Sequence, residues 1–272
     1  MTSHRSSRCA TIANENRILL TEVGSGLHGV TINGTDDHDE MGICIPPPEC
    51  VVGLEKFEQY QDRWHADGTR IGKTVGGQDK RSGPGDTDHV TYALNKWSRL
   101  AAQGNPTVLM PLFAPARSVQ FCNTYGAHLR ANADLFLSKQ AGDRFLGYLH
   151  AQKERMLGLR GRKHTNRPEL VEAFGFDTKC AYHALRLAIQ GHELMTTFTI
   201  RLPMETWDIE YLQRVREGHY TLNTVINDLE SLTRRLERSR DKSPLPEAPD
   251  NTAIDNFLIT MHHAWWEEKG II

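Results

Sequence analysis

Two aspartates separated by one residue, Asp37 and Asp39, are the side chains of this sequence whose type and spacing best suggest chemistry. In an extended segment, side chains at positions i and i+2 leave on the same face, so both carboxylates point into one volume. Left unpaired, they repel each other and one pKa rises. A divalent cation removes that cost, because Mg²⁺ takes oxygen ligands and keeps positions for water and substrate phosphates. The spacing therefore predicts a metal site.

A small turn, Gly24-Ser25, precedes the acidic pair along the chain. Glycine permits a sharp turn, and the free backbone N–H groups and the hydroxyl suit a triphosphate. Taken singly, an Asp-x-Asp at a strand start is often an Asx turn, and a Gly-Ser after a strand is common. Their order in the chain, with Gly42 just beyond the aspartates, favours the functional interpretation.

Three short strands and one helix must position these residues. The apolar run Arg17 to Val23 predicts a strand that stops at the Gly-Ser turn, followed by a short helical turn. Asp37 to Ile45 predicts a second strand, ended by a triple proline. Asp88 to Thr91 predicts a third, and Tyr92 to Gln103 predicts an amphipathic helix ended by Gly104.

The remaining segments indicate a mixed α/β (α+β) chain with two domains. The first fifteen residues show no period and are interpreted as an irregular lead-in, and the glycine-rich stretch 65–87 as a loop or weakly paired hairpin. Further helices are predicted over 125–138, 141–159, 177–190, 208–217, 221–239 and 253–268. We expect one domain with a mixed sheet over residues 1–120 and a helical domain over 121–272.

Composition excludes several classes of protein. The net charge of −2 over 272 residues provides no global basic field, so any contact with a polyanion must use a local patch. The five cysteines are scattered and form no CxxC pair, which argues against a zinc knuckle or a disulfide scaffold. No apolar run is long enough to span a membrane, and the basic N-terminal stretch lacks the apolar segment of a signal peptide, so we do not expect secretion. These features predict a cytoplasmic protein without a membrane partner.

Three blocks of sequence resemble a known family. GSGLHG…TDDHDEMGI is similar to the GSxxxG…SDxDxxG signature of polymerase-β-type nucleotidyltransferases, and resembles most the RNA-repair-associated group of bacteria and phages. The blocks Lys96 to Phe113 and Phe174 to Gly191 are similar to two further blocks of that group. Agreement of several blocks in order is more specific than any single motif.

The resemblance implies a polymerase-β-type core and a role for each matching residue. Gly24 and Ser25 would bind the nucleotide phosphates, and Asp37 and Asp39 would bind Mg²⁺ or Mn²⁺. Asp88 is the expected third carboxylate, with Asp86 as its rival. Two positions depart from the family pattern: Asp36 replaces a usual serine and Met110 a usual acidic residue. Neither is a metal ligand, so both bear on the substrate rather than on catalysis.

The predicted helix from Asp177 carries a narrow polar stripe. Lys179, His183 and Arg186 recur at helical spacing and share one face between apolar positions. Such a stripe usually faces water. The resemblance instead implies that these three side chains contact the phosphates or the acceptor, a task that suits Arg and Lys.

Two other clusters have simpler interpretations. The stretch Lys153 to Arg167 is locally basic and could bind a nucleic-acid backbone, although a solvated helix end is at least as good an explanation. The pair Trp265-Trp266 is interpreted as a packing anchor.

Together these observations predict a two-metal nucleotidyltransferase. It would transfer a nucleoside monophosphate from an NTP to a hydroxyl, with an RNA end as the first choice of acceptor and a protein hydroxyl as the second. In this scheme residues 1–120 form the catalytic domain and 121–272 bind substrate. A non-catalytic module that binds nucleotide or nucleic acid is the alternative from another class, but such a binder gains nothing from clustered carboxylates near a polyanion.

Overall fold

A computed structural model describes residues 4–32, 37–72, 82–159 and 167–272. The described residues form two compact units. The first draws on Met1–Ala101, Thr107–Phe136 and Asp250–Ile272, and the second on Ala102–Pro106 and Leu137–Pro249.

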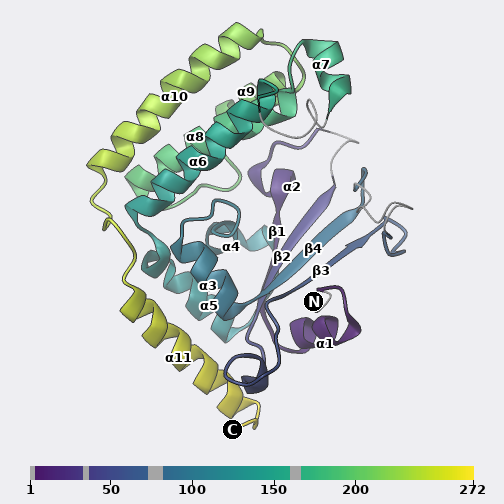
Figure 1. Ribbon diagram of the computed structural model, residues 1–272, viewed down its shortest axis with the longest axis vertical. Coiled ribbons are helices and arrows are strands. Elements are labelled where there is room, and N and C mark those ends of the chain that lie inside the picture. The colour runs from purple at the N-terminus through teal and green to yellow at the C-terminus, as the bar shows by residue number, and fades with distance from the viewer. Residues whose placement is uncertain (1–3, 33–36, 73–81, 160–166) are drawn as a thin grey trace. The chain divides into compact units, whose positions relative to one another are not determined.

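The first unit is built on a five-stranded mixed sheet in the order β3-β4-β2-β1-β5 (Figure 1). The strands are β1 (Arg17–Val23), β2 (His38–Cys44), β3 (Gln59–Trp64), β4 (Thr87–Ala93) and β5 (Val119–Cys122). β2 and β4 are parallel, and every other neighbouring pair is antiparallel. The α/β class predicted from the sequence is therefore confirmed.

The three predicted strands are present, and two others were not predicted. β1 has the predicted bounds, β2 is shorter by one residue at each end, and β4 continues through Ala93 before helix α3 (Leu94–Ala102) begins. β3 was missed because its sequence, QYQDRW, is mostly polar. β5 was missed because it is four residues long and largely exposed.

The irregular lead-in predicted for the first fifteen residues is wrong, because helix α1 spans Ser7–Glu15. The Ser6 hydroxyl caps it by accepting a hydrogen bond from the Cys9 N–H, at 3.1 Å. Its buried residues pack against one face of the sheet with side chains of the strands and the following loop: Cys44, Cys50, Phe57, Tyr60 and Ala93. The helix has only a short apolar face, so this packing stabilises it rather than intrinsic propensity.

Further helices cover the sheet near β1, and Figure 1 shows α3, α4 and α5 on the other side from α1. They are α2 (Gly24–His28), α4 (Met110–Phe113) and α5 (Thr124–Ala131). Trp97 of α3 is fully buried and its indole N–H donates to the Val108 carbonyl at 3.0 Å. Single 3₁₀ turns lie at Pro48–Cys50, Ala116–Ser118 and Ala133–Phe136.

The last helix, α11 (Asn251–Glu268), belongs to the first unit although it follows the helical region. The Trp266 indole N–H donates to the Pro46 carbonyl at 2.9 Å, and Trp265 stacks edge-on against Tyr125 at 5.2 Å between ring centroids. The packing role predicted for this pair is confirmed. The compact units thus do not follow a single cut near residue 120, and the functional division into 1–120 and 121–272 stays a prediction.

The second unit is all helical. Its helices are α6 (Lys139–Met156), α7 (Pro168–Phe174), α8 (Thr178–Thr197), α9 (Thr206–Arg216) and α10 (Leu222–Lys242). α8 packs against α6 and α10 at Gly191, where an added Cβ would lie 2.9 Å from side-chain atoms of both neighbours. The helices predicted here are confirmed with shifted ends, whereas α7 was not predicted. Across the described residues, no helix has the length and apolar character needed to cross a bilayer.

A buried polar network ties β2 to β4 on the sheet face that α1 covers. Glu40 lies opposite His89 in the register, and its carboxylate contacts the His89 ring at 3.0 Å and the Gln120 amide at 2.9 Å. The other ring nitrogen of His89 contacts the Thr91 hydroxyl at 2.8 Å. The His89 hydrogen bond, followed by that from Gln120, lowers the pKa of Glu40 to about 2. The network therefore stabilises the register of the two strands that carry the aspartates.

We predict that Glu40→Gln lowers the free energy of unfolding by about 1–3 kcal/mol at pH 7, since it replaces a charge-assisted hydrogen bond. The folded pKa of Glu40 is depressed, so its contribution is present above the ordinary value of 4.5 and is lost as the pH falls toward about 2. Urea unfolding of both proteins at pH 7 and at pH 3 should show a smaller difference at the lower pH. Glu58→Gln, at an exposed ion pair with Lys96, is the control and should change stability by less than about 1 kcal/mol. A Glu40→Gln effect independent of pH would contradict the prediction.

Candidate active site

Three carboxylates meet at one end of the parallel strand pair. Asp39 of β2 lies directly opposite Asp88 of β4 in the register, and register partners in a parallel pair point to the same face. Asp37 is two residues before Asp39 and shares that face. One oxygen from each of the three lies within 4.8 Å of the other two, and all three residues are half-buried. The structure thus brings together the three acids named from the sequence.

Gly24 brings the backbone against this cluster. It follows Val23, the β1 partner of Asp39, and has φ +73°, a conformation that favours glycine. A Cβ built at Gly24 would lie 2.1 Å from an Asp39 carboxylate oxygen. Ser25 comes next, in the first turn of α2, and is also half-buried. The turn predicted from the sequence therefore lies beside the acidic cluster.

Asp88 has two partners that sequence reasoning missed. The Arg63 guanidinium of β3 lies 3.2 Å from its carboxylate, and the Ser82 hydroxyl also donates to it. Arg63 is opposite Asp88 in the antiparallel register of β3 and β4. Its positive charge offsets part of the repulsion among the three acids. Recognition of β3 as a strand would have been needed to find it.

Asp86, the rival third carboxylate, has a different role in the structure. One of its oxygens accepts the Gly83 N–H at 2.8 Å and the other contacts the His65 ring at 3.0 Å. These partners lower its pKa, with the Gly83 hydrogen bond as the larger cause. Asp86 therefore closes the turn that leads into β4, whereas Asp88 belongs to the acidic cluster.

The donor set suits a hard divalent cation. A cavity of about 320 Å³ is lined by Gly24, Asp39 and Asp88 together with side chains of β3 and β4. The clustered ligands are carboxylate oxygens, without the thiolate or imidazole groups that select zinc or copper. Three half-buried aspartates beside a cavity therefore fit Mg²⁺ or Mn²⁺.

The polar stripe predicted on α8 lies in the second unit. Lys179, His183 and Arg186 are half-buried rather than fully exposed. Burial, followed by the neighbouring Arg186 and Lys179 charges, holds the pKa of His183 well below its ordinary value, so its imidazole is neutral at pH 7. The Arg186 guanidinium donates to the Gln190 amide oxygen at 2.7 Å. The stripe is thus a fixed, cationic surface and not a set of freely solvated side chains.

The other motif positions have structural roles where they are described. Asp177 caps α8 by accepting the Cys180 N–H at 2.9 Å and pairs with Arg167 at 3.3 Å. Met110, at the position where the family pattern is acidic, is buried in the first unit. Asp36 and residues 160–166 of the basic run 153–167 lie outside the described residues.

Comparison with known proteins agrees with the site. Residues 1–260 match the model of RlaP, the RNA repair pathway DNA polymerase beta family, and the chain belongs to this family. Among solved structures, it is similar to a nucleotidyltransferase-like protein from Exiguobacterium sibiricum, with 11% sequence identity, a TM-score of 0.28, and coverage of 86% of this chain and 72% of that one. A search of curated proteins found no match. The family match therefore places the chain among polymerase-β-type proteins.

We predict that Gly24→Ala weakens Mn²⁺ binding by at least tenfold. The added methyl group would displace the Asp39 carboxylate, and the positive φ would add a strain of about 1–2 kcal/mol. Mn²⁺ titration followed by electron paramagnetic resonance measures the affinity. Gly270→Ala is the matched control, because Gly270 also has a positive φ but open space around its Cβ position. Equal Mn²⁺ affinity in the two variants would show that Asp39 is not a ligand.

Proposed function

We propose that this protein is a metal-dependent nucleotidyltransferase that transfers a nucleoside monophosphate from an NTP to a hydroxyl and releases pyrophosphate. The observation that supports this activity best is the meeting of Asp37, Asp39 and Asp88, with one oxygen of each inside 4.8 Å. A carboxylate cluster of this density repels a polyanionic substrate unless cations intervene, so it suits catalysis better than simple binding.

We assign two roles to the residues of the site: some would bind metal ions, and others would bind the phosphates of the NTP. Asp37, Asp39 and Asp88 would hold Mg²⁺ or Mn²⁺. Such ions, when bound, neutralise charge on the phosphates and activate the attacking hydroxyl. The backbone of Gly24 and the hydroxyl of Ser25 would orient the triphosphate beside the acids, a contribution of positioning that dominates phosphoryl-transfer chemistry.

We assign a supporting role to the cationic stripe on α8. Lys179 and Arg186 provide positive charge for phosphate, and the neutral His183 can donate one hydrogen bond and accept another at pH 7. Their half-burial reduces the flexibility that a surface lysine or arginine would have to lose on binding. These are the residues of the second unit that we expect to contact nucleotide or acceptor.

The acceptor we propose is the terminal hydroxyl of an RNA. The family to which the chain belongs is described by its link to RNA repair, and this description supports the choice. A protein hydroxyl is the competing acceptor. The transferred nucleotide would be attached to RNA in the first case and to a protein in the second.

We predict that Asp37→Asn, Asp39→Asn and Asp88→Asn each lower nucleotide transfer by at least a thousandfold while the protein stays folded. Each variant keeps the side-chain size but removes one negative charge from the cluster. Pyrophosphate release with Mg²⁺ or Mn²⁺, an NTP mixture and RNA measures the rate, and circular dichroism checks the fold. Asp86→Asn is the control: it preserves an acceptor for Gly83 and should retain activity within about tenfold. If Asp86→Asn abolished activity and Asp88→Asn did not, our choice of third carboxylate would be wrong.

We further predict that α-³²P-labelled NTP labels RNA and not the protein. EDTA should abolish labelling and excess Mg²⁺ or Mn²⁺ should restore it, since the proposed ions would be held by half-buried carboxylates beside an open cavity. RNA with a blocked terminal hydroxyl is the matched substrate control. Label that appears on protein in the absence of RNA would favour the protein-hydroxyl acceptor instead.

A further inference from the structure

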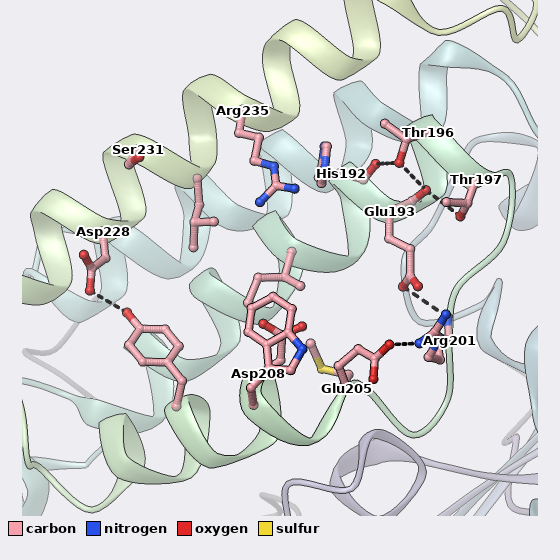
Figure 2. A pocket seen from close by; sticks show the side chains of 15 residues that line it. His192, Glu193, Thr196, Thr197, Arg201, Glu205, Asp208, Asp228, Ser231 and Arg235 are labelled. Carbon is pink, nitrogen blue, oxygen red and sulfur yellow. Dashed lines mark hydrogen bonds and ion pairs between the residues drawn. The ribbon is translucent and has the colours of Figure 1, made fainter.

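A second cavity, of about 510 Å³, lies entirely within the helical unit (Figure 2). It is enclosed by the C-terminal half of α8, the first turns of α9 and the middle of α10. Apolar walls come from Ile189, Met204 and Leu232. Its size falls in the range of pockets that take small organic ligands. None of its lining residues belongs to the acidic cluster or is one of the three stripe residues, Lys179, His183 and Arg186.

Asp208 is the unusual residue of this pocket. It belongs to the first turn of α9, lines the cavity and is only 7% exposed. Among the residues that the structure describes, no hydrogen-bond donor contacts its carboxylate. Burial is the main cause that raises its pKa, nearby Glu193 adds to the effect, and the Arg235 charge partly opposes it. A carboxylate with little access to water and no hydrogen-bond donor is costly, so the site suits a ligand that provides N–H groups.

Several other polar groups of the pocket have partners within it. The Tyr211 hydroxyl donates to Asp228 at 2.8 Å, and Glu205 pairs with Arg201, as Figure 2 shows. Glu193 accepts the Arg201 backbone N–H at 3.1 Å. The position of Asp208 in the first turn of α9 favours its charge through the helix dipole, which explains why an acid is tolerated there. It does not explain why the acid is buried beside an open cavity.

Two exposed side chains flank the pocket with complementary chemistry. Trp207 is 67% exposed and offers an indole face, a sequence-tolerant surface for stacking of planar rings. Arg235 of α10 also lines the pocket, and Figure 2 shows its guanidinium directed toward the cavity. A guanidinium of this kind can bind phosphate through two parallel hydrogen bonds.

We propose that this pocket binds a nucleobase that carries an exocyclic amino group. The amino group donates to Asp208, the ring stacks on Trp207, and the attached phosphate contacts Arg235. The base can belong to a free nucleotide or to an RNA strand, because the recognised chemistry is the same. The inference is independent of the proposed transfer reaction, since it needs neither the three aspartates nor a metal ion.

Calorimetric titration in EDTA with AMP and with IMP tests the proposal. IMP has a carbonyl oxygen where AMP has the amino group and an N1–H where AMP has an unprotonated N1, so the pair tests the exocyclic amino group and not any ring N–H. We expect AMP to bind at least tenfold more tightly than IMP. Asp208→Asn should weaken AMP binding at least tenfold and reduce the preference over IMP. Trp207→Ala should weaken the binding of both nucleotides. Because Trp207 is exposed, this substitution should leave the protein folded.

Two controls separate this site from the acidic cluster. Glu210→Gln changes an exposed acid on the same helix that does not line the pocket, and should leave AMP affinity unchanged. Asp39→Asn should also leave it unchanged. Titration with the oligonucleotides A₅ and U₅ distinguishes the sources: tighter binding of A₅ than of AMP indicates a strand, and the reverse indicates a free nucleotide. Equal affinity for AMP and IMP, or AMP binding that Asp208→Asn and Trp207→Ala leave intact, would overturn the proposal.

Discussion

The crowding of three negative charges at one end of the β2–β4 pair is the constraint on which the rest of this structure depends. Parallel pairing puts Asp39 opposite Asp88. Because side chains alternate between the two faces of an extended segment, Asp37 lies on the same face as Asp39. On the opposite face the Glu40–His89 contact stabilises that register. Arg63 brings a compensating charge to Asp88, and Arg5 also lines the cavity beside the cluster. The repulsion that remains among the three carboxylates is what a cation would offset.

Much of the fold could be predicted because strong local patterns coincide with the packed elements. The run RILLTEV gives β1 with its observed bounds, and helices α8 and α10 follow from apolar periodicity. Helix α1 could not be predicted, because its short apolar face gains stability only against the sheet. β3 could not either, since its alternation contains side chains such as Asp62 and Arg63 whose partners come from other parts of the chain. Tertiary context decides such segments.

The site residues that could be predicted are those that lie close together in the sequence. Asp37 and Asp39 follow from strand spacing alone. Asp88 required the family resemblance, because the register of a parallel pair depends on a distant strand and cannot be read from either segment. Arg63 and the buried Asp208 gave no signal in the sequence: the first depends on an unrecognised strand, and the second on how three helices enclose a cavity.

A crystal of the protein soaked in Mn²⁺, with diffraction recorded at the manganese absorption edge, tests the central claim most directly. We expect an anomalous peak bound by carboxylate oxygens of Asp37, Asp39 and Asp88, at about 2.1–2.2 Å for a hard divalent cation with oxygen ligands. Two results would contradict the account. One is a peak on other residues, and the other is no peak at the three aspartates at a saturating Mn²⁺ concentration.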